Sequence, residues 1–328
     1  MAKPSEKKAR VIALEEHYWD AEVAAHFAAS VHAGHAGELR NRLFDLGELR
    51  LRAMDQAGID VQVISHGGPA LHRIERASAV PLARRANDRL HEVVQTNPQR
   101  FAAFASLPAA DPQASADELE RAVTRLGFKG AMVHGFTLFD GQRLFIDDRR
   151  FWPIFERAQA LEVPIYVHPA RPHPAVTEAY YQDYADEFPE ILTAGWGFTV
   201  ETATQVVRLV LSKALEAYPS LRFIVGHMGE SVPFSLWRID KAISRGAKRR
   251  VPFRDLFCEH FYITTSGNFS SPALLCSVME MGADRILFSV DYPYEDNREG
   301  VEWMKSIPLC AEDRKKILHE NAARLLKL

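Results

Sequence analysis

The sequence predicts a closed (β/α)8 barrel, an α/β fold in which eight parallel strands alternate with helices. Eight short apolar runs recur along the 328 residues, helical segments lie between them, and no linker or composition shift divides the chain. A doubly wound open sheet would also alternate strands and helices, but it usually has fewer strands. The length suits one barrel, because such domains often run past about 250 residues.

The predicted strands are almost continuously apolar and rich in β-branched residues. This composition is expected of strands that are buried on both faces of a parallel sheet, where the alternation of polar and apolar residues is lost. In chain order the runs cover residues 11–15, 61–65, 101–107, 129–134, 163–168, 222–226, 261–265 and 285–290.

The clearest predicted helix follows the third strand. Ser115 and Glu118 have the spacing of a capping box, and Gly127 follows as a stop signal. Its apolar face would consist of Leu119, Ala122, Val123 and Leu126. Further helices are predicted over residues 80–95, 152–160, 200–217, 232–245 and 272–281.

We divide the chain into a mobile polar tail over residues 1–10 and one barrel domain over residues 11–328. Two connections, 18–47 after the first strand and 169–199 after the fifth, are unusually long. Long loops in compact domains are more often functional than idle. Both would lie at the carboxyl ends of the strands, the rim where barrel active sites form.

Composition excludes several classes of protein. With Lys+Arg 40 against Asp+Glu 43, the formal charge of −3 gives no clustered basic surface for nucleic acid. No apolar stretch approaches the roughly 18 to 20 residues that cross a bilayer. Cys258, Cys276 and Cys310 form no CxxC pair, which argues against a disulfide framework or a thiolate zinc site. A soluble protein of the reducing cytoplasm is expected.

Metal-capable side chains stand at the ends of four predicted strands, at His17, His168, His227 and Asp291. Glu15, two residues before His17, would point to the same side of its strand, while Glu16 would point away. Imidazole and carboxylate groups are ordinary ligands of zinc, manganese and iron. A single histidine in a strand is usually a hydrogen-bonded core residue, but the coincidence of four such groups predicts a metal site at the rim.

Two further histidines, His66 and His134, also end predicted strands and are candidates for the pocket wall. The remaining histidines fall in predicted loops or helices, where a solvated side chain is the simpler expectation.

The order of these groups resembles the metal-dependent amidohydrolase superfamily, and within it the non-oxidative aromatic acid decarboxylases. That branch acts on γ-resorcylate, 2,3-dihydroxybenzoate and 5-carboxyvanillate, with aminocarboxymuconate semialdehyde decarboxylases as more distant relatives. The superfamily's hydrolases usually carry HxH where this chain has Glu15 and His17, and the bridging lysine of binuclear hydrolases is replaced by Val133 and His134. The segments that carry the resemblance are LEEH (14–17), RAMDQAGID (52–60), RRAND (84–88), YVHP (166–169), GHMGE (226–230), WRID (237–240), TTSGNF (264–269) and FSVDYPYE (288–295).

The resemblance implies one divalent ion, zinc or manganese. Its ligands would be Glu15, His17, His168 and Asp291. Asp291 would also donate a proton in catalysis, with His227 and Glu230 as a polar pair that orients or relays. A carboxylate that binds a metal should have a lowered pKa, so the two roles of Asp291 are in tension.

The resemblance also implies substrate contacts. Arg238 and Arg52 would bind a carboxylate, although Arg52 lies on a charged helix where a surface position is the simpler expectation. His134 and Ile243 stand where the resorcylate enzymes have asparagines, so we expect a different ring substitution pattern. Aromatic walls are predicted from the rim residues Phe27, Trp196, Phe198 and Tyr292.

The implied reaction is the reversible decarboxylation of an ortho-hydroxybenzoate. Direct cleavage of the bond from ring to carboxylate would leave an unstable aryl carbanion. Protonation of the ring carbon would instead give a dearomatised species that loses carbon dioxide, while the metal holds the hydroxyl and one carboxylate oxygen.

Two alternatives remain open. One is a metal hydrolase of a lactone or amide, or a hydratase of an aromatic-degradation intermediate, with the same fold. The other is a barrel that binds a small acid without turnover. A homodimer or homotetramer is expected by resemblance alone.

Overall fold

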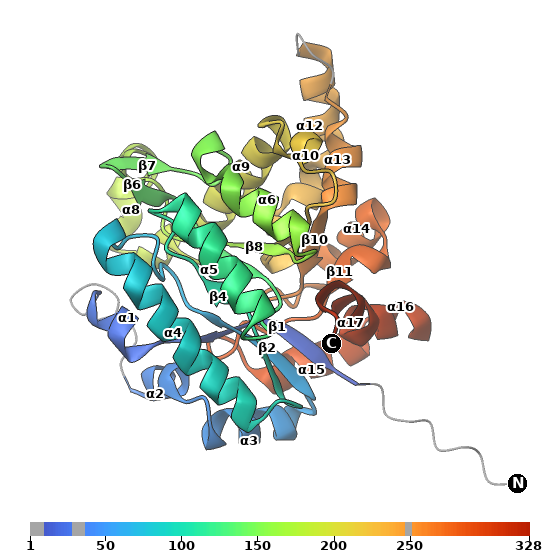
Figure 1. Ribbon diagram of the computed structural model, residues 1–328. Coiled ribbons are helices and arrows are strands. Elements are labelled where there is room, and N and C mark those ends of the chain that lie inside the picture. Colours follow the sequence, from blue (N-terminus) through green and yellow to red (C-terminus); the bar gives the residue numbers. More distant parts are fainter. Residues whose placement is uncertain (1–9, 28–36, 247–250) are drawn as a thin grey trace, which may run out of the picture.

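The computed structural model describes residues 10–27, 37–246 and 251–328, so the predicted tail lies almost wholly outside the described residues. Short parallel strands form a closed ring surrounded by helices (Figure 1). The ring consists of β1 (Ile12–Tyr18), β2 (Val61–His66), β3 (Phe101–Ala103) with β4 (Ala105–Ser106), β5 (Ala131–His134), β8 (Ile165–His168), β9 (Phe223–Val225), β10 (Phe261–Thr264) and β11 (Ile286–Leu287).

Hydrogen bonds close the ring at its two seams. The strands pair in parallel as β1-β2-β3 and as β4-β5-β8-β9-β10-β11. At one seam Phe104 N donates to Ile64 O at 2.9 Å, which joins β3 and β4 into one strand position beside β2. At the other seam Leu14 N donates to Phe288 O at 3.2 Å, next to a parallel bridge between Leu14 and Ser289. The predicted (β/α)8 barrel and its eight strand positions are confirmed.

Alternating side chains of the strands form two apolar layers. One layer fills the barrel lumen, and the other packs between the strands and the outer helices. Ala322 and Leu326 of the last helix, α17 (Asn321–Leu326), join the lumen layer from the end where the strands begin. The inner layer consists of Ile12, Leu14, Val61, Val63, Ala102, Phe104, Met132, Tyr166, Ile224, Tyr262 and Leu287.

The longer helices surround the barrel. They are α3 (Glu48–Ala57), α4 (Arg76–Thr96), α5 (Pro112–Thr124), α6 (Trp152–Ala160), α9 (Gly197–Leu211), α12 (Val232–Gly246), α13 (Phe253–His260), α14 (Ser271–Met281) and α15 (Asn297–Ser306). The short helices include α10 (Ala214–Ala217), α11 (His227–Glu230) and α16 (Ala311–Lys315). None of the helices in the described ranges is long and apolar enough to span a membrane.

Two helix predictions were wrong in detail. Helix α5 begins three residues before Ser115, because the Asp111 side chain accepts from Ala114 N at 3.0 Å and Pro112 is preorganised for the first turn. The predicted helix over residues 200–217 is divided into α9 and α10, because Lys213 between them adopts a left-handed backbone conformation with φ 73°.

The two long connections carry short elements of their own. Residues 18–47 contain α1 (Ala21–Ala25) and α2 (Glu38–Phe44), and residues 169–199 contain α7 (Pro174–Val176), a π-helical turn (Thr177–Tyr181), α8 (Gln182–Ala185) and a 3-10 turn (Pro189–Leu192). Figure 1 shows α1, α8 and the hairpin of β6 (Thr137–Phe139) and β7 (Gln142–Leu144) on one side, opposite α17.

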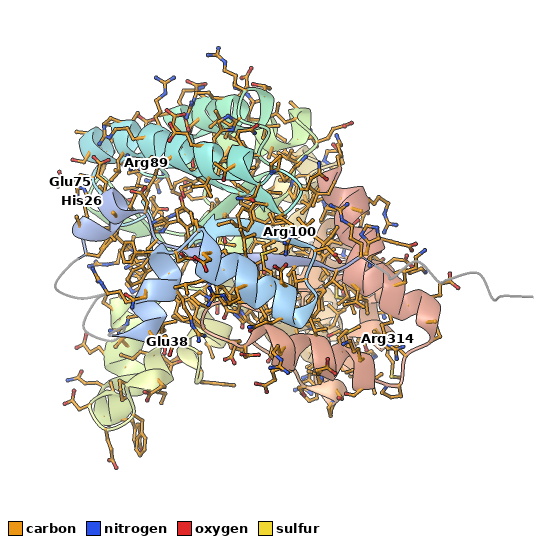
Figure 2. All side chains as sticks on the ribbon, turned by 90° about the horizontal axis from the view of Figure 1, so that it is seen from below. His26, Glu38, Glu75, Arg89, Arg100 and Arg314 are labelled. Carbon is orange, nitrogen blue, oxygen red and sulfur yellow. The ribbon has the colours of Figure 1, made fainter. Side chains whose placement is uncertain are left out.

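An arginine clamp fixes the start of the first connection. Asp20, which caps the N-terminus of α1, receives hydrogen bonds from Arg89 Nε at 2.7 Å and Arg89 Nη2 at 2.8 Å. Arg89 belongs to α4 and is labelled in Figure 2. The bidentate pair ties the rim segment to the outer helix layer.

Candidate metal centre

A β-bulge in β1 brings Glu15 into the barrel. The pairing of β1 with β2 shifts register between Ala13 and Glu16, and Glu15 lies in the left-handed region with φ 58°. The lumen therefore receives Leu14 and Glu15 in succession, and then His17. As predicted, Glu15 and His17 share one face and Glu16 faces away.

Four side chains meet above the lumen layer: Glu15 and His17 from β1, His168 from the end of β8, and Asp291 beyond β11. One ligand atom from each lies within 4.8 Å of all the others. His168 Nε2 is 3.2 Å from Glu15 Oε1, and His17 Nε2 is 3.3 Å from Asp291 Oδ1. The structure thus brings together all four ligands named from the sequence.

The donor set fits a cation. Glu15 Oε1, His17 Nε2 and Asp291 Oδ1 are buried, and no hydrogen-bond partner for them exists among the described residues. Buried polar atoms without partners are rare in folded proteins and call for an explanation. Two carboxylates and two imidazoles that converge in this way are suitable ligands for one zinc or manganese ion.

The imidazoles of His17 and His168 are each oriented by an oxygen beside Nδ1, on the side of the ring away from the cluster. His168 Nδ1 lies 2.7 Å from Pro169 O, and His17 Nδ1 lies 3.3 Å from Ser65 Oγ, so each Nε2 faces the cluster. Burial, followed by the charge of His17, lowers the pKa of His168 well below its usual value. His168 is therefore neutral, as a metal ligand must be.

The second oxygen of Glu15 is also held. Glu15 Oε2 accepts hydrogen bonds from the Tyr166 hydroxyl and, at 3.3 Å, from Thr264 Oγ1. A Cβ atom at Gly226 would lie 2.7 Å from Glu15 Oε2, so only glycine fits at the end of β9. The carboxylate is thus fixed from several strands.

His227 and Glu230 stand beside the cluster on a tight left-handed turn. His227, Met228, Gly229, Glu230 and Ser231 all have positive φ, from 50° to 70°. This turn places His227 Nδ1 at 2.7 Å from Glu230 Oε1, and Thr199 Oγ1 donates to Glu230 Oε2 at 2.8 Å.

The other nitrogen of this imidazole faces the metal ligands. His227 Nε2 is 3.5 Å from Glu15 Oε1 and 3.7 Å from Asp291 Oδ2. Burial lowers the pKa of His227, but the charges of Glu15 and Glu230 outweigh this and raise it well above its usual value. His227 can therefore carry a proton close to Asp291.

The exposed fractions of the side chains in the cluster show which side of the site is open to solvent. The side chains of Glu15 and His17 are 0% exposed, whereas those of Asp291 and His227 are 16% and 20% exposed. A molecule from solvent would thus meet Asp291 and His227 first.

Most residues predicted to contact substrate lie away from this cluster. Arg52 is exposed on α3 and pairs with Glu48. Arg238 is exposed on α12, Trp196 is exposed at the start of α9, and Phe198 is half-buried two residues later. Phe27 is half-buried and lines a small recess with Trp19 and His66.

Tyr292 and His134 are both buried. The Tyr292 ring lies 4.8 Å from the Arg50 guanidinium and borders a cavity of about 270 Å³ between α2, α3 and α15. His134 Nδ1 lies 3.0 Å from His168 Nδ1, so His134 lies behind a metal ligand and not on the open side.

The sequence reasoning missed Arg50 and chose Arg52 on the same helix. Arg50 is 0% exposed, donates to His17 O through Nη2 and donates to Gln62 Oε1 at 3.1 Å. A signal was present, because Arg50, Met54 and Ala57 have the i, i+4, i+7 spacing of one buried helix face.

A buried carboxyl group on α9 gives a stability prediction. Burial raises the pKa of Glu201 to about 7, although His173 N donates to it at 3.0 Å. A carboxyl whose pKa is raised by folding destabilises the protein as pH climbs from the unfolded value of 4.5 to about 7. We expect Glu201→Gln to add about 1 to 3 kcal/mol to the free energy of unfolding at about pH 8 and little at about pH 5.

Urea titrations at both pH values would measure this effect. Glu190→Gln, a change at an exposed position, serves as the control. Equal stabilisation by Glu201→Gln at both pH values would contradict the assignment.

Comparison with known proteins identifies the family. A family model described as Amidohydrolase matches residues 17–328. A γ-resorcylate decarboxylase of Polaromonas sp. (strain JS666) is 42% identical over 327 residues, which cover 97% of this chain and 98% of that protein.

Two solved structures share the fold. A dihydroxybenzoic acid decarboxylase of Polaromonas sp. JS666 with bound manganese and the inhibitor 2-nitroresorcinol superimposes with a TM-score of 0.90 at 42% identity, covering 97% of each chain. A 5-carboxyvanillate decarboxylase of Novosphingobium aromaticivorans, complexed with manganese and 4-hydroxy-3-methoxy-5-nitrobenzoic acid, gives 0.86 at 30% identity, covering 99% of this chain and 98% of that one.

These findings confirm the predicted superfamily and its decarboxylase branch. The two solved structures described above hold manganese, and the choice between zinc and manganese in this chain stays a prediction. The chain belongs to the amidohydrolase family, within the branch that contains the γ-resorcylate and 5-carboxyvanillate decarboxylases.

Proposed function

We propose that this protein catalyses the metal-dependent, non-oxidative decarboxylation of an aromatic acid that carries a hydroxyl ortho to its carboxylate. The observation that carries the proposal is the convergence of Glu15, His17, His168 and Asp291 within 4.8 Å, with the His227–Glu230 pair on the open side. The similarity to decarboxylases of dihydroxybenzoates supports the same reaction class.

Glu15, His17, His168 and Asp291 would hold one divalent ion. When bound, such an ion supplies positive charge to the phenol and carboxylate oxygens of a substrate. The protein fixes the ligands through Tyr166, Thr264, Ser65 and the carbonyl of Pro169.

Asp291 and His227 form a proton path to the ring carbon in this proposal. Burial alone would raise the pKa of Asp291, but His17 and His227 lower it to about 2, so the resting carboxylate is ionised. His227, with its Nε2 3.7 Å from Asp291 Oδ2, can supply the proton that Asp291 then delivers. Glu230 stabilises the imidazolium through Nδ1. In this order Asp291 binds the ion as a carboxylate and carries a proton only during the transfer.

Carbon dioxide release from a panel of ortho-hydroxybenzoates tests the function. Manganese-loaded protein should decarboxylate at least one member, and the corresponding para-hydroxybenzoates should be inert because they cannot offer neighbouring oxygens to one ion. Turnover of lactones or amides in place of every panel acid would favour the hydrolase alternative. Activity on γ-resorcylate alone would contradict the substrate difference expected from His134 and Ile243.

We also propose that the protein is a homodimer or homotetramer. Phe234 and Trp237, one helical turn apart on α12, are 83% and 63% exposed, and Arg238 adjoins them. Large exposed apolar side chains that lie close together favour a protein interface. The cytoplasmic location remains a prediction.

Charge on this helix face should separate the subunits. We expect the double change Phe234→Asp and Trp237→Asp to lower the mass, from dimer to monomer or from tetramer to a smaller species, because carboxylates would be buried in an apolar contact. Light scattering after gel filtration measures the mass. Leu211→Asp, at a 40% exposed position on α9, is the control and should leave the mass unchanged. A monomeric parent protein would refute the proposal.

A further inference from the structure

Glu16 lies between the metal ligands Glu15 and His17 in sequence, but its side chain has other partners. It is 0% exposed and points to the outer face of β1. Its Oε1 accepts from Val290 N at 3.0 Å, and its Oε2 accepts from Tyr292 N at 3.1 Å. The two peptide N–H groups on either side of Asp291 therefore end on one carboxylate.

Those two hydrogen bonds flank an unfavourable backbone conformation. Asp291 has φ 77°, in the left-handed region that residues other than glycine rarely adopt. Such a conformation persists only where the surrounding structure imposes it. Tyr292 O also accepts from His17 N at 2.7 Å, so residues 290–292 are joined directly to β1.

Further donors complete the surroundings of Glu16. Gln62 Nε2 donates to Oε2 at 3.3 Å, and Ser289 Oγ lies 3.4 Å from Oε1. Gln62 Oε1 in turn accepts from Arg50, whose other nitrogen donates to His17 O. Three N–H groups donate to the Glu16 carboxylate, the Ser289 hydroxyl beside it also donates to Leu14 O, and the network continues to the backbone of His17.

We propose that Glu16 is a positioning residue of the metal centre. Its carboxylate holds the backbone on both sides of Asp291 in place relative to Glu15 and His17, so that ligands from the two ends of the chain converge on one ion. The inference rests on the metal centre of the proposed function, but not on the identity of the substrate.

Glu16→Gln is the sharpest test because it keeps the shape of the side chain. A glutamine has one acceptor oxygen and one NH2 donor, so one of the two N–H groups that flank Asp291 would face a donor. We expect manganese to bind about 10- to 100-fold more weakly, the usual effect of removing a group that orients metal ligands.

Glu118→Gln is a matched control on α5. Glu118 is 4% exposed, and its carboxylate accepts from Asn87 Nδ2 at 2.7 Å and from Arg121 Nε at 2.9 Å. The chemical change is the same as at Glu16 and the side chain is likewise buried, but it contacts none of the four ligands. Ser289→Ala, which removes a hydroxyl that donates to Leu14 O and lies 3.4 Å from Glu16 Oε1, should shift manganese affinity in the same direction by a smaller factor.

Three readouts are taken on the parent protein and the variants: manganese affinity by competition with a chelator, the electron paramagnetic resonance spectrum of bound Mn²⁺, and the unfolding temperature. Both Glu→Gln variants should lose thermal stability. Only the Glu16 variant should bind manganese more weakly and change the spectrum.

Parent-like affinity and spectrum in a folded Glu16→Gln protein would overturn the proposal, as would equal loss of manganese in the Glu118 control. If Glu16→Gln does not fold, unchanged affinity in Ser289→Ala would overturn it instead. Failure of the parent to decarboxylate any hydroxybenzoate would refute the proposed function and leave these metal readouts interpretable.

Discussion

Asp291→Asn is expected to lower kcat by about 10² to 10⁴, the usual contribution of a positioned general acid, while the protein stays folded and binds manganese. An amide keeps the size of the side chain and one oxygen ligand, but it cannot accept a proton from His227 and pass it to a ring carbon. Asp291 has the most exposed side chain of the four proposed ligands, at 16%, which suits it to reach a substrate.

The measurement is the rate of carbon dioxide release at saturating substrate, together with manganese content. Asp296→Asn, a change at the exposed cap of α15 five positions along the same segment, is the control and should retain parent kcat. A metal-replete Asp291→Asn protein with parent kcat would remove Asp291 from the proton path. In that case His227, with its Nε2 facing the same space, becomes the donor to test.

Removal of the metal is expected to reduce decarboxylation to the uncatalysed background and to lower the unfolding temperature. The cluster holds two carboxylates within 4.8 Å of each other, and Glu15 is fully buried, so loss of a cation leaves like charges together in a site of low polarity. An ion present at about 1,000 times its dissociation constant contributes about 4 kcal/mol to the free energy of unfolding.

Dialysis against a chelator, followed by activity and melting measurements, tests this expectation. Added Mn²⁺ should restore both properties, whereas Ca²⁺ should not, because calcium prefers an all-oxygen ligand set and two of these ligands are imidazoles. Undiminished turnover by protein whose elemental analysis shows no metal would exclude the metal from the reaction.

The strands and the ligands could be predicted from the sequence because both follow from one local pattern. An apolar run that ends in His or Asp, as at His168 and Asp291, indicates a buried strand and a polar group at its carboxyl end. Parallel strands in a barrel then bring such groups to the same rim. No knowledge of side-chain conformations is needed for that step.

Contacts that depend on tertiary geometry could not be predicted in this way. Arg50 and Arg52 lie on the same charged helix, and only packing against β2 determines that Arg50 is buried beside Gln62. The supporting role of Glu16 depends on the loop after β11 folding back onto β1, 274 residues away in sequence. The sequence also gives no direct sign of the bulge that turns Glu15 inward.

The bulge determines which residues of β1 face the barrel lumen, and so what a deletion in this strand would do. Before it, the lumen residues are even-numbered, Ile12 and Leu14, and after it the inward residues are odd-numbered, Glu15 and His17. Even-numbered residues thus face inward in the first half of the strand, and odd-numbered residues face inward in the second half. Deleting Glu15 would leave one residue opposite Val63 and restore uniform parity, so that Leu14 and His17 still face inward and only the Glu15 carboxylate is lost. A barrel of this kind can therefore lose its chemistry by one codon while keeping its fold.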